Sequence, residues 1–430
     1  MTIQAKTSSS EPQFAALIGI DWADQKHDVC LREVDSDHFE YRVVEHTPEA
    51  IDEWVTQLRK RFGGRPVAIC LEQTRGALIY ALMKYEFLVL YPINPAKLAK
   101  YRQAMTSSGA KDDPTDAHLL LDYLAHHREH LVAWKPDDAC TRHIALLVEG
   151  RRAAIDLRTQ LSNTLKSTLK GYFPQAIAWV GEELSTALAC DLVIKWPTLE
   201  ALQRARLETI RKFYYAHNCR RGDLIEQRLR EIAQAKPLCT DSAIVQSAAL
   251  MVVLLAKQLR QLLVSIKEYD KQLETLMAQH PDAPIFQNLP GAGAVMAPRL
   301  LSAFGTDRER ITSAAEMQTL SGIAPVTKRS GKSCVVHRRW ACPKFLRQTF
   351  HEFAAHSIPQ SRWAKAYYDL QRSRGTRHHA AIRALAFKWI RVIYHCWKTK
   401  TRYDEDLYLD SLRKHQSPLL DYLPKCNQAA

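Results

Sequence analysis

Ala15-Ala16-Leu17-Ile18-Gly19-Ile20-Asp21 is a run of apolar residues that ends on an acid. A short apolar run of this length is typical of a buried β-strand. A second run, Val67-Ala68-Ile69-Cys70-Leu71, is also followed by an acid, Glu72. An acid at the end of a buried strand needs a partner, so Asp21 and Glu72 are the first candidates for a functional site.

The segments around these two runs alternate between strand and helix patterns. Three early strands joined by short turns, followed by crossovers, indicate an α/β fold with a mixed sheet of ribonuclease-H type over residues 13–135. The predicted strands are Phe14–Asp21, His27–Glu33, Phe39–Glu45, Val67–Glu72 and Phe87–Ile93, and the predicted helices are about Pro48–Arg61, Gly76–Tyr85, Pro95–Met105 and Pro114–His127.

Two further acids, Asp113 and Asp116, lie at the start of the last of these helices. Residues three apart share one helix face, so both can point at one ion, whereas Asp112 should face elsewhere. With Asp21 and Glu72 they would hold one or two Mg²⁺ ions, which prefer carboxylate oxygens and serve phosphodiester chemistry. Taken alone, the pair also fits a helix N-terminus, where the helix dipole favours acids.

The positive charge of the chain is concentrated in one segment. The 430 residues carry a net charge of +14, and the segment Val326–Arg402 holds 18 Lys/Arg against two acids, so the rest is close to neutral. Such a block is typical of a surface that binds phosphate backbones. A solvated basic face or a membrane-surface contact is the alternative.

The composition indicates a cytoplasmic protein. The 46% hydrophobic and 25% charged residues are ordinary for a soluble globular protein. The ten cysteines show no regular spacing, the first residues are polar, and no apolar run approaches the ~18 residues of a membrane span. We expect a reducing compartment and no membrane partner.

The region 141–280 reads as mostly helical. Apolar residues recur there in a heptad pattern, at Leu255, Leu259, Leu262, Ile266, Tyr269, Leu273 and Leu276. Such a seam is typical of a coiled coil, either as an internal helical hairpin or between two copies of the chain. The pattern does not distinguish the two.

A third region, 281–403, opens with a Pro-Gly-x-Gly turn at Pro290–Gly293 and contains Ser330-Gly331 within the basic segment. A serine flanked by cations can attack a DNA phosphorus, and glycine beside it permits close approach of the backbone. A phosphate-binding turn is the simpler interpretation, and Ser321, Ser333, Tyr367 or Tyr368 are rival nucleophiles. We expect the tail, 404–430, to be peripheral.

The ordered set of motifs resembles the DEDD-type transposases of bacterial insertion sequences, described as bridge-RNA-guided serine recombinases. The resemblance runs from about residue 15 to 400 and departs from the family pattern at Gln73-Thr74-Arg75 and at 337–343. The matching pieces are Ile18-Gly19-Ile20-Asp21, Leu71-Glu72-Gln73-Thr74, Asn94-Pro95, Lys111–Ala117, Leu289–Gly293, Gly322-Ile323-Ala324-Pro325, Ser330-Gly331 and Phe345-Leu346-Arg347.

The resemblance implies a RuvC-like domain with metal acids Asp21, Glu72, Asp113 and Asp116, a coiled-coil middle and a C-terminal transposase domain with nucleophile Ser330. It also implies a structured guide RNA that pairs with donor and target DNA, and a synaptic oligomer, a dimer or tetramer.

We therefore expect a transposase that exchanges DNA strands through a covalent serine–DNA intermediate. A Mg²⁺-dependent endonuclease or junction resolvase, and a non-catalytic nucleic-acid scaffold, are the alternatives. The residues expected to bind nucleic acid are Lys111, Arg329, Lys332, Arg338, Arg339 and Arg347.

Overall fold

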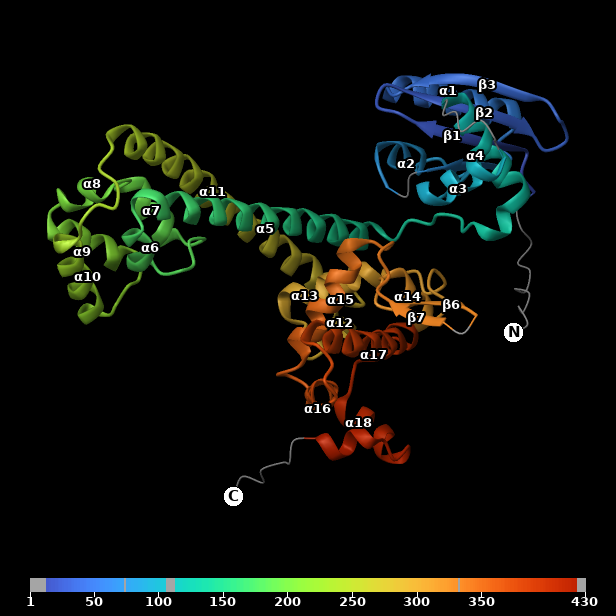
Figure 1. Ribbon diagram of the computed structural model, residues 1–430. Helices are drawn as coiled ribbons and strands as arrows, with labels where there is room; N and C mark the ends of the chain where they lie inside the picture. The colour runs from blue at the N-terminus through green and yellow to red at the C-terminus, as the bar shows by residue number, and fades with distance from the viewer. Residues whose placement is uncertain (1–12, 73–74, 106–112, 332, 424–430) are drawn as a thin grey trace. The chain divides into compact units, whose positions relative to one another are not determined.

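A computed structural model describes residues 13–72, 75–105, 113–331 and 333–423 (Figure 1). The chain folds as two compact units, Met1–Pro136 and Asp137–Ala430.

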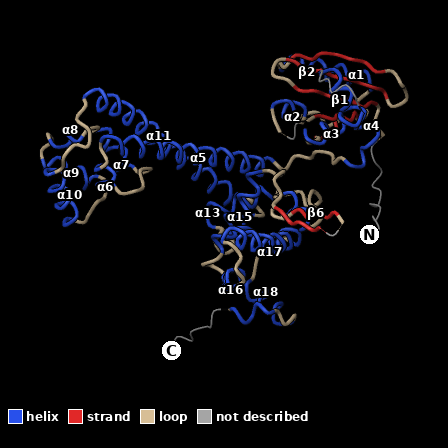
Figure 2. Tube along the Cα trace, viewed as in Figure 1, coloured by secondary structure: helices blue, strands red, loops and turns tan. Residues whose placement is uncertain are grey.

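The first unit contains a five-stranded mixed sheet with the order β3-β2-β1-β4-β5. Figure 2 draws its strands in red. β1 pairs antiparallel with β2 and parallel with β4, β2 is antiparallel to β3, and β4 is parallel to β5. This is the predicted mixed sheet, and its strands end within two residues of the predicted ends. The strands are β1 (Ala16–Trp22), β2 (Lys26–Glu33), β3 (Phe39–Glu45), β4 (Val67–Leu71) and β5 (Leu88–Pro92).

Helices cover both faces of this sheet. Alternate side chains of β1 and β4 point to opposite faces, which is why both strands are apolar throughout. Ile18 and Ile20 pack with α1 (Pro48–Phe62) and α2 (Ala77–Leu82) on one face. Leu17 packs with α3 (Pro95–Met105) and α4 (Asp113–His127) on the other. The short helix η1 (Arg128–His130) follows α4.

The second unit contains two long antiparallel helices, α5 (Ala139–Tyr172) and α11 (Ser242–Gln279). Thr141 hydrogen-bonds His280, and Arg151 pairs with Asp270, so residues late in α11 lie beside residues early in α5. Gly150 leaves room for the ring of Tyr269, whose hydroxyl would lie 2.8 Å from an added Cβ.

The predicted heptad seam is buried within the chain. Of its seven residues, Leu255, Leu259, Ile266 and Leu273 are buried and the other three are partly buried, along the helix that pairs with α5. The apolar seam is therefore accounted for by an internal helical hairpin.

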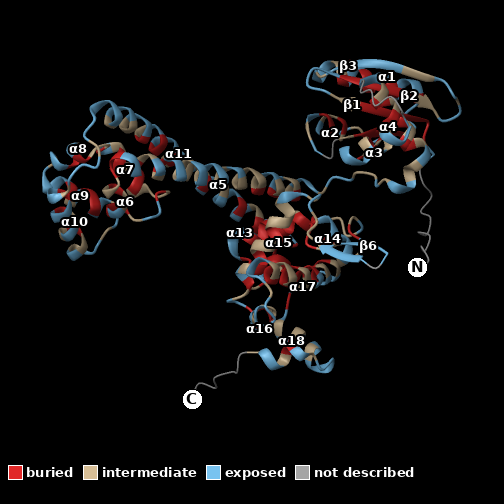
Figure 3. Ribbon diagram, viewed as in Figure 1, coloured by how far each residue is buried: buried red, intermediate tan, exposed pale blue. Residues whose placement is uncertain are grey.

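The C-terminal end of α5 and the N-terminal end of α11 pack with five shorter helices (Figure 3). The buried aromatic residues Phe173, Trp179 and Tyr214 belong to this core. These helices are α6 (Gln175–Val180), α7 (Ala187–Lys195), α8 (Leu199–Gln203), α9 (Leu207–Ala216) and α10 (Gly222–Gln234).

The N-terminal end of α5 and the C-terminal end of α11 pack against a second helical core. This core contains the buried aromatic residues Phe304, Phe350, Trp363, Trp389 and Trp397. A two-stranded hairpin projects from this part. The elements are α12 (Ala283–Gln287), α13 (Gly293–Phe304), α14 (Ala314–Leu320), β6 (Val326–Ser330), β7 (Ser333–His337), α15 (Lys344–Ser357), α16 (Arg362–Ser373), α17 (His378–Thr399), α18 (Glu405–Lys414) and η2 (Pro418–Tyr422).

Two expectations from the sequence need correction. The tail is not peripheral throughout, because Leu409 of α18 and Leu419 of η2 are buried in this core. In addition, α11 is long and apolar enough to cross a membrane by length and composition alone. The pairing of its seam with α5 gives those apolar residues a place inside the protein.

Candidate catalytic centres

Asp21 and Glu72 are neighbours at one end of the sheet. β1 and β4 pair in parallel, and their last paired residues are Ile20 and Leu71. Asp21 and Glu72 directly follow these two residues, so they lie beside each other. Neighbouring strands lie about 4.8 Å apart, so two carboxylates meet at this edge. Both residues are partly buried. Because side chains alternate along a strand, Asp21 lies on the same face as Gly19.

Helix α4 crosses that face of β1 at Gly19. A Cβ on Gly19 would lie 2.0 Å from the carbonyl oxygen of Ala117 and 2.5 Å from the backbone nitrogen of Leu121, so only glycine permits this approach. Asp113 and Asp116 belong to the first turn of α4, just before Ala117. Asp116 directly precedes Ala117, so it lies next to the contact at Gly19, two positions along β1 from Asp21.

The two acids of α4 have different surroundings. Asp113 is exposed, whereas Asp116 is only 2% exposed. Both oxygens of Asp116 accept hydrogen bonds from Arg102 of α3, with Nε–Oδ1 at 2.7 Å and Nη2–Oδ2 at 2.6 Å. Sequence reasoning missed Arg102, because only the packing of α3 beside α4 brings it to Asp116. Lys111, expected to bind nucleic acid, lies outside the described residues.

The donor chemistry of this edge fits a divalent ion. Asp21, Glu72 and Asp113 offer carboxylate oxygens, the ligands that Mg²⁺ prefers. Both oxygens of Asp116 already accept hydrogen bonds from Arg102, so a metal at Asp116 would share these oxygens with Arg102 or displace it. Among the described residues, the four acids do not gather into a group whose ligand atoms all lie within 4.8 Å of one another.

The group that meets that distance in the described chain is His127, Glu129 and His130, at the end of α4 and in η1. Sequence reasoning did not single it out. Two of the three are exposed, and the ring of His130 pairs with Glu129 at 3.3 Å. Exposed groups of this kind are common without a metal, so we assign it no role.

The second centre is the tip of the β6–β7 hairpin. Ser330 is the last residue of β6 and pairs with Ser333 of β7. Gly331 follows with φ +54°, a left-handed conformation that favours glycine and turns the chain back. Ser330 is exposed, as is most of the hairpin (Figure 3). Lys332 lies outside the described residues.

The rival nucleophiles differ in accessibility. Ser321 is fully buried, and its hydroxyl donates to the carbonyl of Gln318, so DNA cannot reach it in this structure. Tyr367 is partly buried, and burial raises the pKa of its hydroxyl. The hydroxyl of Tyr368 lies 2.7 Å from Nδ1 of His378. Ser333 is exposed opposite Ser330 and stays a rival.

The predicted nucleic-acid contacts of the second unit lie on and beneath this hairpin. Arg329 is exposed on β6, and Arg338 and Arg339 directly follow β7. Arg347 belongs to the first turn of α15, and its Nη1 lies 3.4 Å from the sulfur of Cys342. Sequence reasoning missed Arg383 of α17, which lines a cavity with Arg338 and Arg339.

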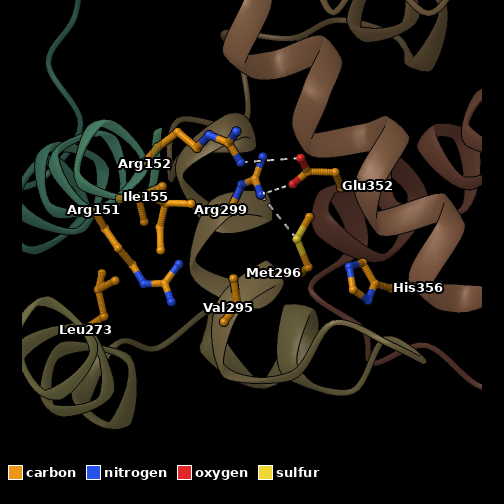
Figure 4. A pocket seen from close by; sticks show the side chains of 10 residues that line it. Arg151, Arg152, Ile155, Leu273, Val295, Met296, Arg299, Glu352 and His356 are labelled. Atoms are coloured by element: carbon orange, nitrogen blue, oxygen red, sulfur yellow. Dashed lines mark hydrogen bonds and ion pairs between the residues drawn. The ribbon is translucent and has the colours of Figure 1, made fainter. Parts of the chain in front are cut away.

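A different arginine cluster lies where α5 meets α13 and α15, around a cavity of about 170 Å³ (Figure 4). Arg152 and Arg299 both point at Glu352, and Arg151 pairs with Asp270 at 2.5 Å. Arg299 also donates to Thr349, although its Nη2 has no partner within the described chain.

The arginines of that cluster form ion pairs with carboxylates. Arg152 has a second partner in Asp156, at 2.6 Å, so Asp156, Asp270 and Glu352 balance three arginines. This paired cluster ties the long helix α5 to the C-terminal core.

Comparisons with known proteins identify the family of the chain. A family model described as "Transposase" matches residues 18–174, and one described as "Transposase IS116/IS110/IS902 family" matches residues 283–369. The first match contains the four acids and the second contains Ser330. Together they cover more than half of the chain.

Several relatives come from insertion elements. The mini-circle putative transposase for IS117 of Streptomyces coelicolor is 26% identical, covering 92% of this chain and 97% of that protein. The 42 kDa protein of insertion element IS900 of Mycobacterium paratuberculosis is 25% identical over 76% of this chain and 81% of that protein. The 43.6 kDa protein of IS110 of Streptomyces coelicolor is 28% identical over 69% and 72%.

The chain belongs to the DEDD-type insertion-sequence transposases, the family of IS110, IS116 and IS902. It is therefore a DNA transposase of an insertion sequence.

Proposed function

We propose that the chain exchanges DNA strands through a covalent bond between Ser330 and DNA. The observation that carries this proposal is the position of Ser330, exposed at the tip of a hairpin that projects from a basic domain. A nucleophile at such a tip can enter a DNA groove without moving the core behind it.

In the proposed step, the Oγ of Ser330 attacks a DNA phosphorus and the oxygen–phosphorus bond forms. The bond from that phosphorus to one deoxyribose oxygen breaks, and the serine proton passes through solvent to the leaving oxygen. The phosphodiester energy is kept in the serine ester, so a second DNA end can later attack it and release Ser330. Arg329 beside the serine stabilises the charge that develops on phosphorus.

Asp21, Glu72, Asp113 and Asp116 would hold Mg²⁺, which stabilises negative charge on phosphate oxygens when bound. Their positions at the ends of β1 and β4 and in the first turn of α4 support this assignment. The proposed role of Arg102 is to neutralise Asp116 until the metal and DNA are in place.

Two partners belong to the proposal through the family resemblance. A guide RNA would pair with donor and target DNA, and a homo-oligomer, dimer or tetramer, would let the acids of one protomer serve the Ser330 of another. The uneven charge supports a nucleic-acid partner, because 18 of the 60 Lys and Arg lie between residues 326 and 402.

The first test traps the covalent intermediate. The wild-type protein should give a DNA adduct that protease digestion shortens, and Ser330→Ala should give none. Ser333→Ala, Tyr367→Phe and Tyr368→Phe should still give it. An adduct that survives in Ser330→Ala removes the serine assignment, whereas cleaved DNA without any adduct favours a Mg²⁺-dependent endonuclease.

The second test mixes Asp21→Asn protein with Ser330→Ala protein. Each alone should be inactive, and the mixture should recover part of the strand exchange if one protomer's acids serve another's serine. No recovery in mixtures that form mixed oligomers would contradict the shared site. Sequencing the RNA that co-purifies with the protein tests the guide.

A further inference from the structure

A small basic cavity lies at the base of the β6–β7 hairpin, opposite the tip that carries Ser330. It has a volume of about 170 Å³, and its charged lining is Arg338, Arg339 and Arg383, beside His337 and the backbone turn at Gly322. Arg338 and Arg339 come from the loop after β7, and Arg383 comes from α17. The cavity therefore needs two segments that lie more than forty residues apart in the sequence.

Close packing of a turn holds this cavity open. Gly322 has φ +70°, and a Cβ there would lie 2.2 Å from the sulfur of Cys342 and 2.7 Å from its Cβ. A larger residue would push away the loop that carries Arg338 and Arg339. The Gly322–Pro325 turn, one of the family motifs, thus has a physical task at this position.

The arginines of this cavity are not balanced by acids. Within the described part of the chain, Arg338, Arg339, Arg347 and Arg383 form no ion pair with a carboxylate, whereas the three arginines around Glu352 all do. The Nε atoms of Arg338 and Arg339 are buried without a hydrogen-bond partner, as is Nε2 of His337.

The charges around Arg383 are of its own sign. Burial, and then the charges of Arg338 and Arg347, lower the pKa of its guanidinium. Like charges that are partly removed from water repel each other, and an anion among them removes that repulsion. Guanidinium groups match phosphate best, because their N–H groups can bind two of its oxygens together.

We propose that Arg338, Arg339 and Arg383 bind a phosphate group of the nucleic-acid strand that Ser330 attacks. This site rests on the proposed function of the hairpin, and it adds a second point at which the protein holds the strand. Ser330 and Val326 are four residues apart on β6, about 13 Å at 3.3 Å per residue. The phosphate in the cavity is therefore a flanking one, and the cavity sets how far along the strand the reacting phosphorus lies from it.

The test compares two arginines of the basic segment. In Arg383→Gln the affinity for a labelled DNA duplex should fall about 10-fold, and the slope of log K against log[salt] should become shallower by about 0.9. In Arg362→Gln both should stay unchanged, because Arg362 already pairs with Asp406 at 2.5 Å. Wild-type affinity and slope in Arg383→Gln would overturn the site.

The two proposals fail in different ways. If wild-type protein gives no adduct but Arg383→Gln still loses affinity and slope, the serine chemistry fails and the phosphate site stands.

A last measurement separates nucleic-acid phosphate from free phosphate. At equal ionic strength, inorganic phosphate should raise the unfolding temperature of the wild type above that in chloride, and less so in Arg383→Gln. If the variant loses this shift but binds DNA normally, the cavity takes free phosphate and the nucleic-acid assignment is overturned. A normal unfolding temperature of Arg383→Gln in chloride shows that the variant is folded.

Discussion

The second unit contains two arginine clusters, which differ in whether carboxylates neutralise their charge. Around Glu352, Arg151, Arg152 and Arg299 each pair with a carboxylate (Figure 4). At the base of the hairpin, Arg338, Arg339 and Arg383 share a cavity in which the described chain supplies no carboxylate. The first cluster is complete without a ligand, and the second is not.

The difference teaches how to interpret a basic protein. The number of arginines does not tell binding from architecture, because both clusters contain three. A buried arginine with its carboxylate is part of the fold, and removing the acid should destabilise the protein. An arginine without an acid costs little to remove, and its loss should appear in binding.

The first unit also contains a partly buried arginine that pairs with a carboxylate, Arg102 with Asp116. Breaking this pair should have the largest effect on stability. Asp116→Asn removes the carboxylate that pairs with Arg102, whose side chain is only 17% exposed. We expect a loss of about 4 kcal/mol in the free energy of unfolding of this unit, measured by urea denaturation. Asp113→Asn, at an exposed position, should change stability by less than about 0.5 kcal/mol. Equal stability of the two variants would show that the Arg102 pair contributes nothing.

Within the paired cluster, Glu352→Gln should cost about 3 kcal/mol, because Arg299 is left buried without its carboxylate. Asp156→Asn removes an exposed acid of the same cluster and should cost less than about 1 kcal/mol. A loss in Asp156→Asn as large as that in Glu352→Gln would contradict the central role of Glu352.

The same pair predicts an acid limit to stability. Burial alone would raise the pKa of Glu352, but Arg299, with help from Gln348 and Arg152, holds it below the ordinary 4.5. The carboxylate therefore stabilises the fold above the unfolded-state value, and this contribution is lost as the pH falls through the lowered folded-state pKa. The wild type should lose more stability than Glu352→Gln between pH 5 and 3. Parallel pH profiles would contradict this.

Gly322→Ala tests the unpaired cluster without changing a charge. The methyl group meets Cys342, and the left-handed backbone disfavours alanine, so we expect a loss of about 2 kcal/mol in stability. DNA affinity should fall as well, because the loop with Arg338 and Arg339 moves. Wild-type affinity in a destabilised Gly322→Ala protein would show that the cavity does not depend on this turn.

The smallest effect on stability is expected for Arg338→Gln. Its charge has no carboxylate partner in the described chain, so the unfolding free energy should change by less than about 0.5 kcal/mol. The salt slope for DNA binding should nevertheless become shallower by about 0.7–0.9. A large loss of stability with unchanged binding would move Arg338 to the architectural class.

Much of the first unit could be predicted because its evidence is local. Apolar runs, their turns and the acids that follow them are read residue by residue, and the strands lie within two residues of the predicted ends. The helical hairpin was one of two predictions from the heptad seam, since a repeat shows which side is apolar but not what covers it.

The sequence by itself determined where the strands lie along the chain, the positions of four acids and a serine, and the segment in which positive charge is concentrated. Only the tertiary structure decided that Arg102 holds Asp116, that α5 covers the seam of α11, and that Arg383 joins Arg338 and Arg339. The residues in these contacts are far apart in the sequence, from 14 residues for Arg102 and Asp116 to more than 80 for α5 and α11. Local periodicity and spacing carry no information about such pairs, because packing chooses them after the elements have formed.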